Sequence, residues 1–265
     1  MRIIAAIITV FCLSFALPAH AVKLEYKVKQ GDTWKQKLTM RGDGAMEAGG
    51  MKFDMVMETI STTANKVTSV AANGDFVSTV EYKPTDTKMT VNGMSFPSPP
   101  QQAMNLTVTT TRLGKPLKVE GLEKAGVAGG SDFTKFMNIA PAQFPDKDIQ
   151  VGESWDASPP AETFPAKITG KLLSVKGVGG KQVAEVEYTF KISGEALGKL
   201  IKQLSGMDID IGGPGMTGTS VTLVDVASGI PGATKGTIES DFIIKLMGME
   251  ARQTMKMTIT ADVVK

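Results

Sequence analysis

Alternation of apolar and polar residues runs through most of this sequence and limits the folds that it can adopt. The clearest example lies at 184–192, where every second residue is apolar and the residues between are charged or bear a hydroxyl. A period of two places the apolar set on one face of a β-strand. The same period recurs at 51–57 and at 254–263. The sequence therefore predicts an all-β, mainly antiparallel fold whose strands have one apolar and one polar face.

Turn residues divide this pattern into roughly a dozen strands. Asn73-Gly74 and Asn92-Gly93 predict tight hairpins, and Gly177–Gly180 predicts a further turn. We also expect a turn at 41–44 and a flexible loop at 212–218, because both stretches are rich in glycine. Many strands with short turns favour one sheet curled into a half-barrel or barrel. Two packed sandwiches are the alternative.

The first expected strand lies near the start of the chain, and the expected amphipathic helix lies in its second half. Leu24, Tyr26 and Val28 alternate with charged residues, which predicts a strand at 24–28. The segment 195–204 instead has helical spacing, with Ser193 before it as a candidate cap. Its apolar face would be formed by Leu197, Leu200, Ile201 and Leu204. We expect this amphipathic helix to cover the concave apolar face of the sheet.

Two short motifs occur twice and suggest related halves. Gly31-Asp32-Thr33-Trp34 and Gly152-Glu153-Ser154-Trp155 have the same pattern of glycine, acid, hydroxyl and tryptophan, and contain the only two tryptophans. Leu113–Pro116 and Ser228–Pro231 form a second pair at a similar offset. We therefore predict halves at 22–145 and 146–265 that share one domain. The glycine-acid pairs are interpreted as turns and the tryptophans as core anchors.

The first 21 residues have the pattern of a cleaved export signal. Arg2 precedes an apolar run, and Ala19-His20-Ala21 fits a cleavage site. We expect an exported protein, periplasmic or secreted, whose mature chain starts at Val22. Removal takes away Cys12 and His20, the only cysteine and histidine. Disulfides, thiolate or imidazole catalysis and Cys/His zinc sites are thereby excluded from the mature chain.

The remaining composition narrows the kinds of partner. With Arg2 removed, basic and acidic residues nearly balance and form no basic stripe, so no nucleic acid is expected. No later stretch has the roughly 18 apolar residues of a membrane-spanning helix. An outer-membrane barrel would carry aromatic girdles, whereas this chain has two tryptophans and three tyrosines.

Methionines are the residues that point most directly to a function. Fifteen of the sixteen lie beyond the predicted signal, several as Met-x-Met on strands. They are interpreted as a soft apolar surface for a lipid-like ligand, as thioether ligands for Cu(I), or simply as core filler. We expect no metal and no cofactor, because copper-binding methionine clusters usually include histidine or cysteine. The predicted ligand-binding residues are Met55, Met57, Leu197, Leu200, Ile201, Phe242, Ile244, Met255 and Met257.

No local signature selects an enzyme. The glycine-rich stretches lack the Gly-Lys-Ser/Thr helix start of a phosphate-binding loop. Acidic residues are numerous, but nothing marks a catalytic pair for glycoside hydrolysis or a Ser-Lys hydrolase. We therefore predict an exported, non-enzymatic protein that binds an apolar small molecule or lipid. The alternative is a structural protein with a solid core that contacts another envelope protein.

Several of these segments resemble a known family. The stretch 24–34, the segment from Phe144 to Trp155 and the run 218–229 are similar to an exported bacterial domain of unknown function, number 6263. This resemblance implies export and a β-rich fold and supplies no catalytic residues. A curled sheet with one helix is also similar in architecture to periplasmic lipoprotein carriers of the LolA type.

Overall fold

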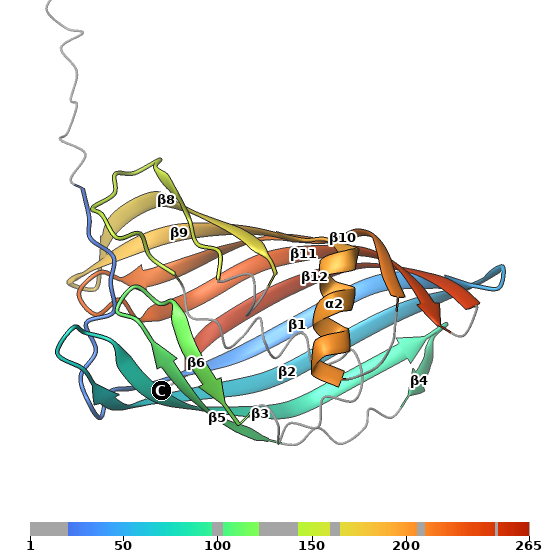
Figure 1. The fold of residues 1–265 in the computed structure, drawn as a ribbon, viewed down its shortest axis with the longest axis horizontal. Helices are drawn as coiled ribbons and strands as arrows, with labels where there is room; N and C mark the ends of the chain where they lie inside the picture. The colour runs from blue at the N-terminus through green and yellow to red at the C-terminus, as the bar shows by residue number, and fades with distance from the viewer. Residues whose placement is uncertain are drawn as a thin grey trace, which may run out of the picture.

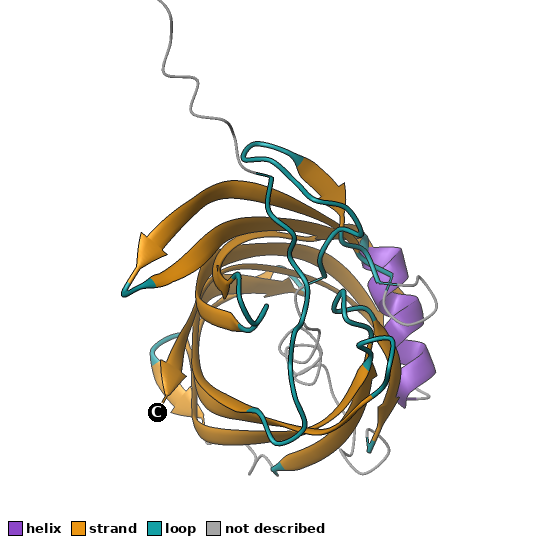
Figure 2. Ribbon diagram, turned by 90° about the vertical axis from the view of Figure 1, so that its left-hand side faces the viewer, coloured by secondary structure: helices purple, strands orange, loops and turns teal. Residues whose placement is uncertain are grey.

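The computed structural model describes residues 21–96, 103–121, 143–159, 165–205, 210–246 and 249–264. Within them, one antiparallel 12-stranded sheet dominates, and it curls strongly without closing (Figures 1 and 2). The predicted all-β curled half-barrel is therefore confirmed. The predicted signal peptide lies outside the described residues, except for Ala21. The strands are β1 (Thr33–Ala48), β2 (Met51–Val70), β3 (Phe76–Val91), β4 (Met94–Phe96), β5 (Met104–Thr110), β6 (Pro116–Glu120), β7 (Ser154–Asp156), β8 (Lys167–Val178), β9 (Lys181–Ile192), β10 (Asp210–Asp225), β11 (Pro231–Leu246) and β12 (Met249–Val264).

The strand order follows the chain in two runs. Neighbouring strands read β7 to β12 and then β1, β2, β3, β5 and β6, while β4 pairs with β3 alone. The two runs join where β1 pairs with β12, with Leu38 opposite Ala261. Strands β6 and β7 lie at the two ends of this order. The first predicted half thus forms one side of the sheet and the second half the other.

Two segments predicted as a turn and a loop lie within strands instead, so these predictions were wrong, although the register of β10 against β11 shifts between Gly212 and Gly215. The expected turn at 41–44 lies inside β1, and the chain turns later at Gly49 and Gly50, which both have positive φ. The expected loop at 212–218 lies inside β10. In both stretches the glycines remove side chains that would collide with neighbours. A Cβ on Gly218, for example, would overlap the ring of Phe190.

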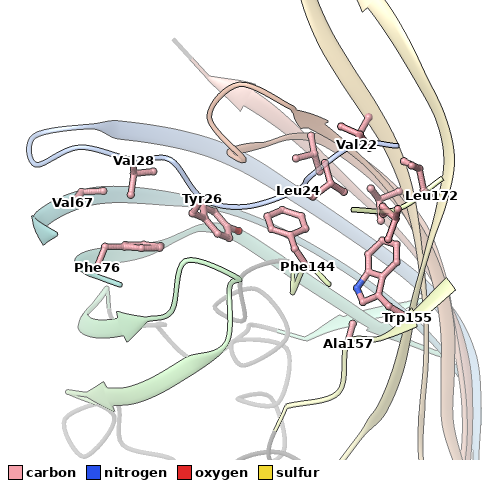
Figure 3. Packing of buried hydrophobic residues seen from close by; sticks show 14 residues of the cluster. Val22, Leu24, Tyr26, Val28, Val67, Phe76, Phe144, Trp155, Ala157 and Leu172 are labelled. Carbon is pink, nitrogen blue, oxygen red and sulfur yellow. The ribbon is translucent and has the colours of Figure 1, made fainter. Parts of the chain in front are cut away.

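Residues 22–30 form an extended segment across one end of the sheet, here called the N-terminal strap (Figure 3). The predicted strand at 24–28 was therefore wrong, although the alternation of buried residues is real. The segment bonds to three separate loops instead of one neighbouring strand. Val22 exchanges two hydrogen bonds with Ile149, while the N–H groups of Tyr26 and Lys27 donate to the carbonyls of Arg112 and Ser228.

The strap closes its end of the sheet with a compact core. Leu24 and Val67 are fully buried, and Tyr26 lies 5.2 Å from Phe144 between ring centroids. Trp155 donates a hydrogen bond of 2.9 Å to the carbonyl of Gln143. Figure 3 shows these side chains gathered beneath the strap. This end of the curled sheet, the strap end, is filled by protein side chains.

The two glycine-acid-hydroxyl-tryptophan motifs form the same turn. Gly31 and Gly152 have φ of 94° and 93°. The Asp32 carboxylate accepts from the Lys29 N–H at 2.8 Å, as the Glu153 carboxylate does from Gln150 at 2.7 Å. The turns then bond to the next strand in matching fashion, Gly31 N–H to the Val67 carbonyl and Gly152 N–H to the Leu172 carbonyl. The acid therefore stabilises the turn and the tryptophan follows it into the core.

The predicted helix is present as α2 (Gly194–Ser205). The hydroxyl of Ser193 accepts the N–H of Ala196 at 3.2 Å, which caps the helix start. Lys199 lies 2.7 Å from Glu195 one turn earlier, on the exposed side. Within the described parts of the chain, no helix is long and apolar enough to cross a bilayer.

Candidate ligand-binding face

The concave face of the sheet carries an apolar surface that extends over β1, β2, β11 and β12. On β1 the inward residues alternate, starting with the buried Leu38 and Met40. Pairing places Met257 and Met57 on either side of Gly42, and Met255 and Met55 on either side of Gly44. The residues of this surface, here called the apolar lining, are Leu38, Met40, Met46, Phe53, Met55, Met57, Ile238, Phe242, Ile244, Met255, Met257 and Ile259.

Two glycines on β1 make room for the methionines of β12. A Cβ on Gly42 would lie 2.7 Å from Cγ of Met257 and 3.1 Å from Sδ of Met255. The thioether of Met255 therefore extends over β1 towards β2. Because neighbouring strands are about 4.8 Å apart, this brings β12 side chains over a strand that has none of its own at these positions. In this part of the lining, flexible methionine side chains of β12 therefore cover Gly42 and Gly44 of β1.

Burial along the lining falls steadily from the middle of the sheet to one end. On β12, Met257 is 7% exposed, Met255 is intermediate and Met249 is 70% exposed. On β2 the same progression runs from the half-buried Met57 to Met51, which is 62% exposed. These residues have the same alternation phase and so belong to the same face. The lining therefore becomes accessible at the end opposite the strap.

Helix α2 packs against the concave side of the sheet. Leu197 is 4% exposed and clusters with Ile192, Met216 and Met257. Figure 1 shows α2 lying in front of the strands, and Figure 2 shows it at the edge of the curled sheet. Gly198 allows the close contact, since a Cβ there would lie 3.3 Å from Cβ of Ile211 at the start of β10.

The predicted ligand-binding residues fall into three groups. Leu197 and Met257 are buried members of one cluster, and Met57, Phe242 and Met255 pack against it while partly exposed. Met55 and Ile244 lie further along the same face and are half-buried. The side chains of Leu200 and Ile201 lie outside the described residues.

Sequence reasoning missed several members of the lining. Met46 and Phe53 pair across β1 and β2 in the same phase as the predicted residues. Their alternation was visible, but the false turn at 41–44 cut β1 short and hid Met46. The glycines Gly42 and Gly44 gave no signal of their own, because only the register with β12 shows what lies above them.

Charge is confined to the opposite face of these strands. No inward position between Leu38 and Ala48 on β1, or between Met249 and Ala261 on β12, holds an acidic or basic residue. Outside, Arg252 donates to Asp241 at 3.0 and 2.7 Å. The Arg252 hydrogen bond holds the pKa of the Asp241 carboxyl below its usual value. An uncharged wall of this kind is suited to contact with an apolar ligand.

Metal coordination finds no support from the usual ligands. Among the described residues, no group of three or more histidine, cysteine, aspartate or glutamate side chains is placed to hold a metal ion.

At the strap end, burial raises the pKa of Tyr188 well above 10, so its hydroxyl stays protonated near neutral pH.

Comparison with known proteins leaves the family open. No family model matches the chain, and no curated protein matches it. A DUF1329 family protein from Desulfovibrio piger is similar over 86% of this chain and 84% of its own, at 11% identity and a TM-score of 0.19. OccK7 (OpdD) from Pseudomonas aeruginosa is similar over 88% of this chain and 99% of its own, at 7% identity and a TM-score of 0.22. The first of these belongs to a family of unknown function, and the resemblances to family 6263 and to LolA are not supported by the comparisons.

Proposed function

We propose that this protein is an exported, non-enzymatic carrier that holds a lipid-like or otherwise apolar ligand against the apolar lining. The observation that carries the proposal is a face of partly exposed methionine, phenylalanine and isoleucine side chains without a charged residue. A folded chain normally covers such a surface. Here α2 packs against its deeper part, and the part nearer the turns is left half-exposed.

The dimensions of the lining support an elongated ligand. From Met40 to Ala48 the inward residues of β1 span eight residues, which corresponds to about 26 Å at 3.3 Å per residue. The strap fills the other end of the curled sheet, so the ligand would lie between the filled core and the exposed turns. A long hydrocarbon chain has this shape and needs no charged partner.

The chemistry of the side chains supports a ligand of variable structure. Methionine has three rotatable bonds and a polarisable sulfur, so a surface rich in it adapts to differently shaped apolar molecules. Met55, Met57 and Met255 are all half-buried, which leaves them free to change rotamer around a ligand. Each fully buried side chain of this size contributes about 1.5–3 kcal/mol when it is removed from water.

The binding test measures the affinity of the purified protein for the uncharged dye N-phenyl-1-naphthylamine. Gly42→Leu places a side chain in the space above β1 that Met255 and Met257 now occupy, and so displaces both from the lining. We expect this substitution to weaken dye binding at least tenfold. Gly177→Leu is the matched control, because Gly177 lies on β8 with no heavy atom within 4 Å of the added Cβ. Met255→Gln, which keeps the length of the side chain and adds polarity, should weaken binding without filling the space.

Two results would contradict the carrier. One is an absence of dye binding by the wild-type protein together with no co-purified lipid in native mass spectrometry. The other is equal affinity in the wild-type, Gly42→Leu and Gly177→Leu proteins. Either result favours the alternative, a structural protein with a solid core that acts through its surface.

A further inference from the structure

We propose that the end of the sheet opposite the strap, here called the distal end, rests on a lipid bilayer with uncharged or zwitterionic headgroups. The distal end carries the β1–β2 and β3–β4 turns, the end of β11 and the start of β12, seen at the right of Figure 1. The proposal rests on the proposed carrier function for its purpose, since the bilayer would be the source or destination of the ligand. The contact itself can be tested without a ligand.

Three methionines at the distal end are the most exposed large hydrophobic residues of the described part of the chain. Met51, Met94 and Met249 are 62%, 63% and 70% exposed. Each is the first residue of its strand, at the turn side of β2, β4 and β12. Phe96 adds a ring that is 44% exposed. Large apolar side chains gathered at one end of a molecule mark a surface that contacts a protein or a membrane.

Two of these methionines continue the apolar lining. Met51 has the phase of Met55 and Met57 on β2, and Met249 has the phase of Met255 and Met257 on β12. The lining therefore reaches the rim of the sheet without an interrupting charge. An apolar ligand that leaves along this face meets the surface on which the rim rests, and does not cross water.

The charges at the distal end favour a surface without net charge. Lys52 lies 3.7 Å from Asp54, Lys245 lies 3.7 Å from Glu250, and Lys88 lies 3.0 Å from Asp86. Each of these lysines is thus offset by a neighbouring carboxylate. Binding to anionic lipid requires a surplus of lysine or arginine, which these pairs do not leave.

The arrangement of the methionines favours a bilayer over a folded protein partner. They lie on three hairpins, and each is at least 62% exposed, so each side chain projects from the rim instead of being covered by its neighbours. A fluid bilayer can accommodate exposed side chains that project separately. Methionine side chains keep much of their rotamer freedom when they insert into it. A protein interface of useful affinity instead needs a continuous, well-packed core.

The test is flotation of the full mature protein with vesicles of phosphatidylcholine alone and of phosphatidylcholine mixed with phosphatidylglycerol. Met51→Asp/Met249→Asp is the test variant, and both residues are exposed enough for the substitutions to leave the fold intact. Val178→Asp is the matched control, because Val178 is 59% exposed at the β8–β9 turn on the strap end. Circular dichroism and dye binding, measured without vesicles, report fold and ligand binding separately.

The expected result is flotation of the wild-type and Val178→Asp proteins with pure phosphatidylcholine. The Met51→Asp/Met249→Asp variant should partition at least tenfold less while its circular dichroism spectrum stays that of the wild-type protein. The proposal is overturned if the wild-type protein does not float, floats only with the anionic mixture, or forms a dimer that the same variant abolishes. Equal loss of flotation in the Val178→Asp protein overturns it as well. Failure of dye binding with intact flotation would remove the carrier function and leave the membrane contact standing.

Discussion

Gly170 on β8 offers a direct test of how the core at the strap end is held together. A Cβ at this position would overlap the indole ring of Trp155, with Nε1 of that ring only 2.8 Å away. The same Nε1–H donates to the carbonyl of Gln143 at 2.9 Å. Gly170→Ala must therefore displace the ring and stretch or break this hydrogen bond.

The size of the effect follows from these two contacts. Loss of a buried hydrogen bond costs about 0.5–1.5 kcal/mol, and overpacking of a well-packed core costs about 1–3 kcal/mol. We therefore expect Gly170→Ala to lower the free energy of unfolding by about 2–4 kcal/mol. For a chain of this length, about 2–4 °C of Tm is lost per kcal/mol, so Tm should fall by about 5–15 °C.

Thermal unfolding followed by circular dichroism measures the change, and tryptophan emission should shift to longer wavelength as Trp155 becomes hydrated. Gly177→Ala provides the control on the same strand. No heavy atom lies within 4 Å of its added Cβ, and its φ needs no glycine, so stability should be unchanged or rise by up to about 1 kcal/mol. Equal Tm values for the two variants would refute the claim that Gly170 is required by the Trp155 ring.

Three further predictions concern other contacts. Gly218→Ala places a Cβ within the ring of Phe190, and urea unfolding should show a loss of about 1–3 kcal/mol. Arg112→Met removes the nearest cationic partner of Glu25 in the strap, whose side chain is 16% exposed and which also lies 3.8 Å from Lys23 and from Lys27. Trypsin should then cut the strap faster than in the wild-type protein. Burial acts to raise the pKa of Asp225, but hydrogen bonds from Lys181 and two backbone N–H groups outweigh it and leave the pKa below its usual value. The stabilisation is therefore complete above the pKa of an unfolded aspartate, about 3.9, and is lost as pH falls through the lower folded pKa. In urea unfolding over this pH range, Asp225→Asn should be less stable than wild type at neutral pH and should lose less stability on acidification.

The alternation of apolar and polar residues predicted the strands well where a strand has one solvent-exposed face and one apolar face. The alternation at 184–192 became β9, and the Asn73-Gly74 and Asn92-Gly93 signals became hairpins. The helix was equally clear, because Leu197 and its neighbours have a spacing that no strand shares. These features depend on residues close together in the chain.

Features that depend on distant pairing could not be predicted in the same way. Glycines at 42 and 44 suggested a turn, and only their register with Met257 and Met255 shows that they are the floor of a face. The strap has a strand-like sequence, but its hydrogen bonds go to Ile149, Arg112 and Ser228, which are far from it in sequence. The residues predicted to bind a ligand on β2, β11 and β12 share one face of the sheet, and only the register shows that this face extends to Met46.

The pairing of β1 with β12 also sets the order in which the molecule can form. Lys35 pairs with Val264, so strands from the two ends of the described chain are neighbours in the sheet. Contacts of such long sequence separation slow folding, because the intervening loop must close before they form. The strap, although synthesised early, bonds to loops of both halves and can dock only after those halves have come together. β1 therefore lacks one of its two neighbouring strands until β12 has been synthesised, and the strap cannot complete its hydrogen bonds until the loop that contains Ser228 has been synthesised.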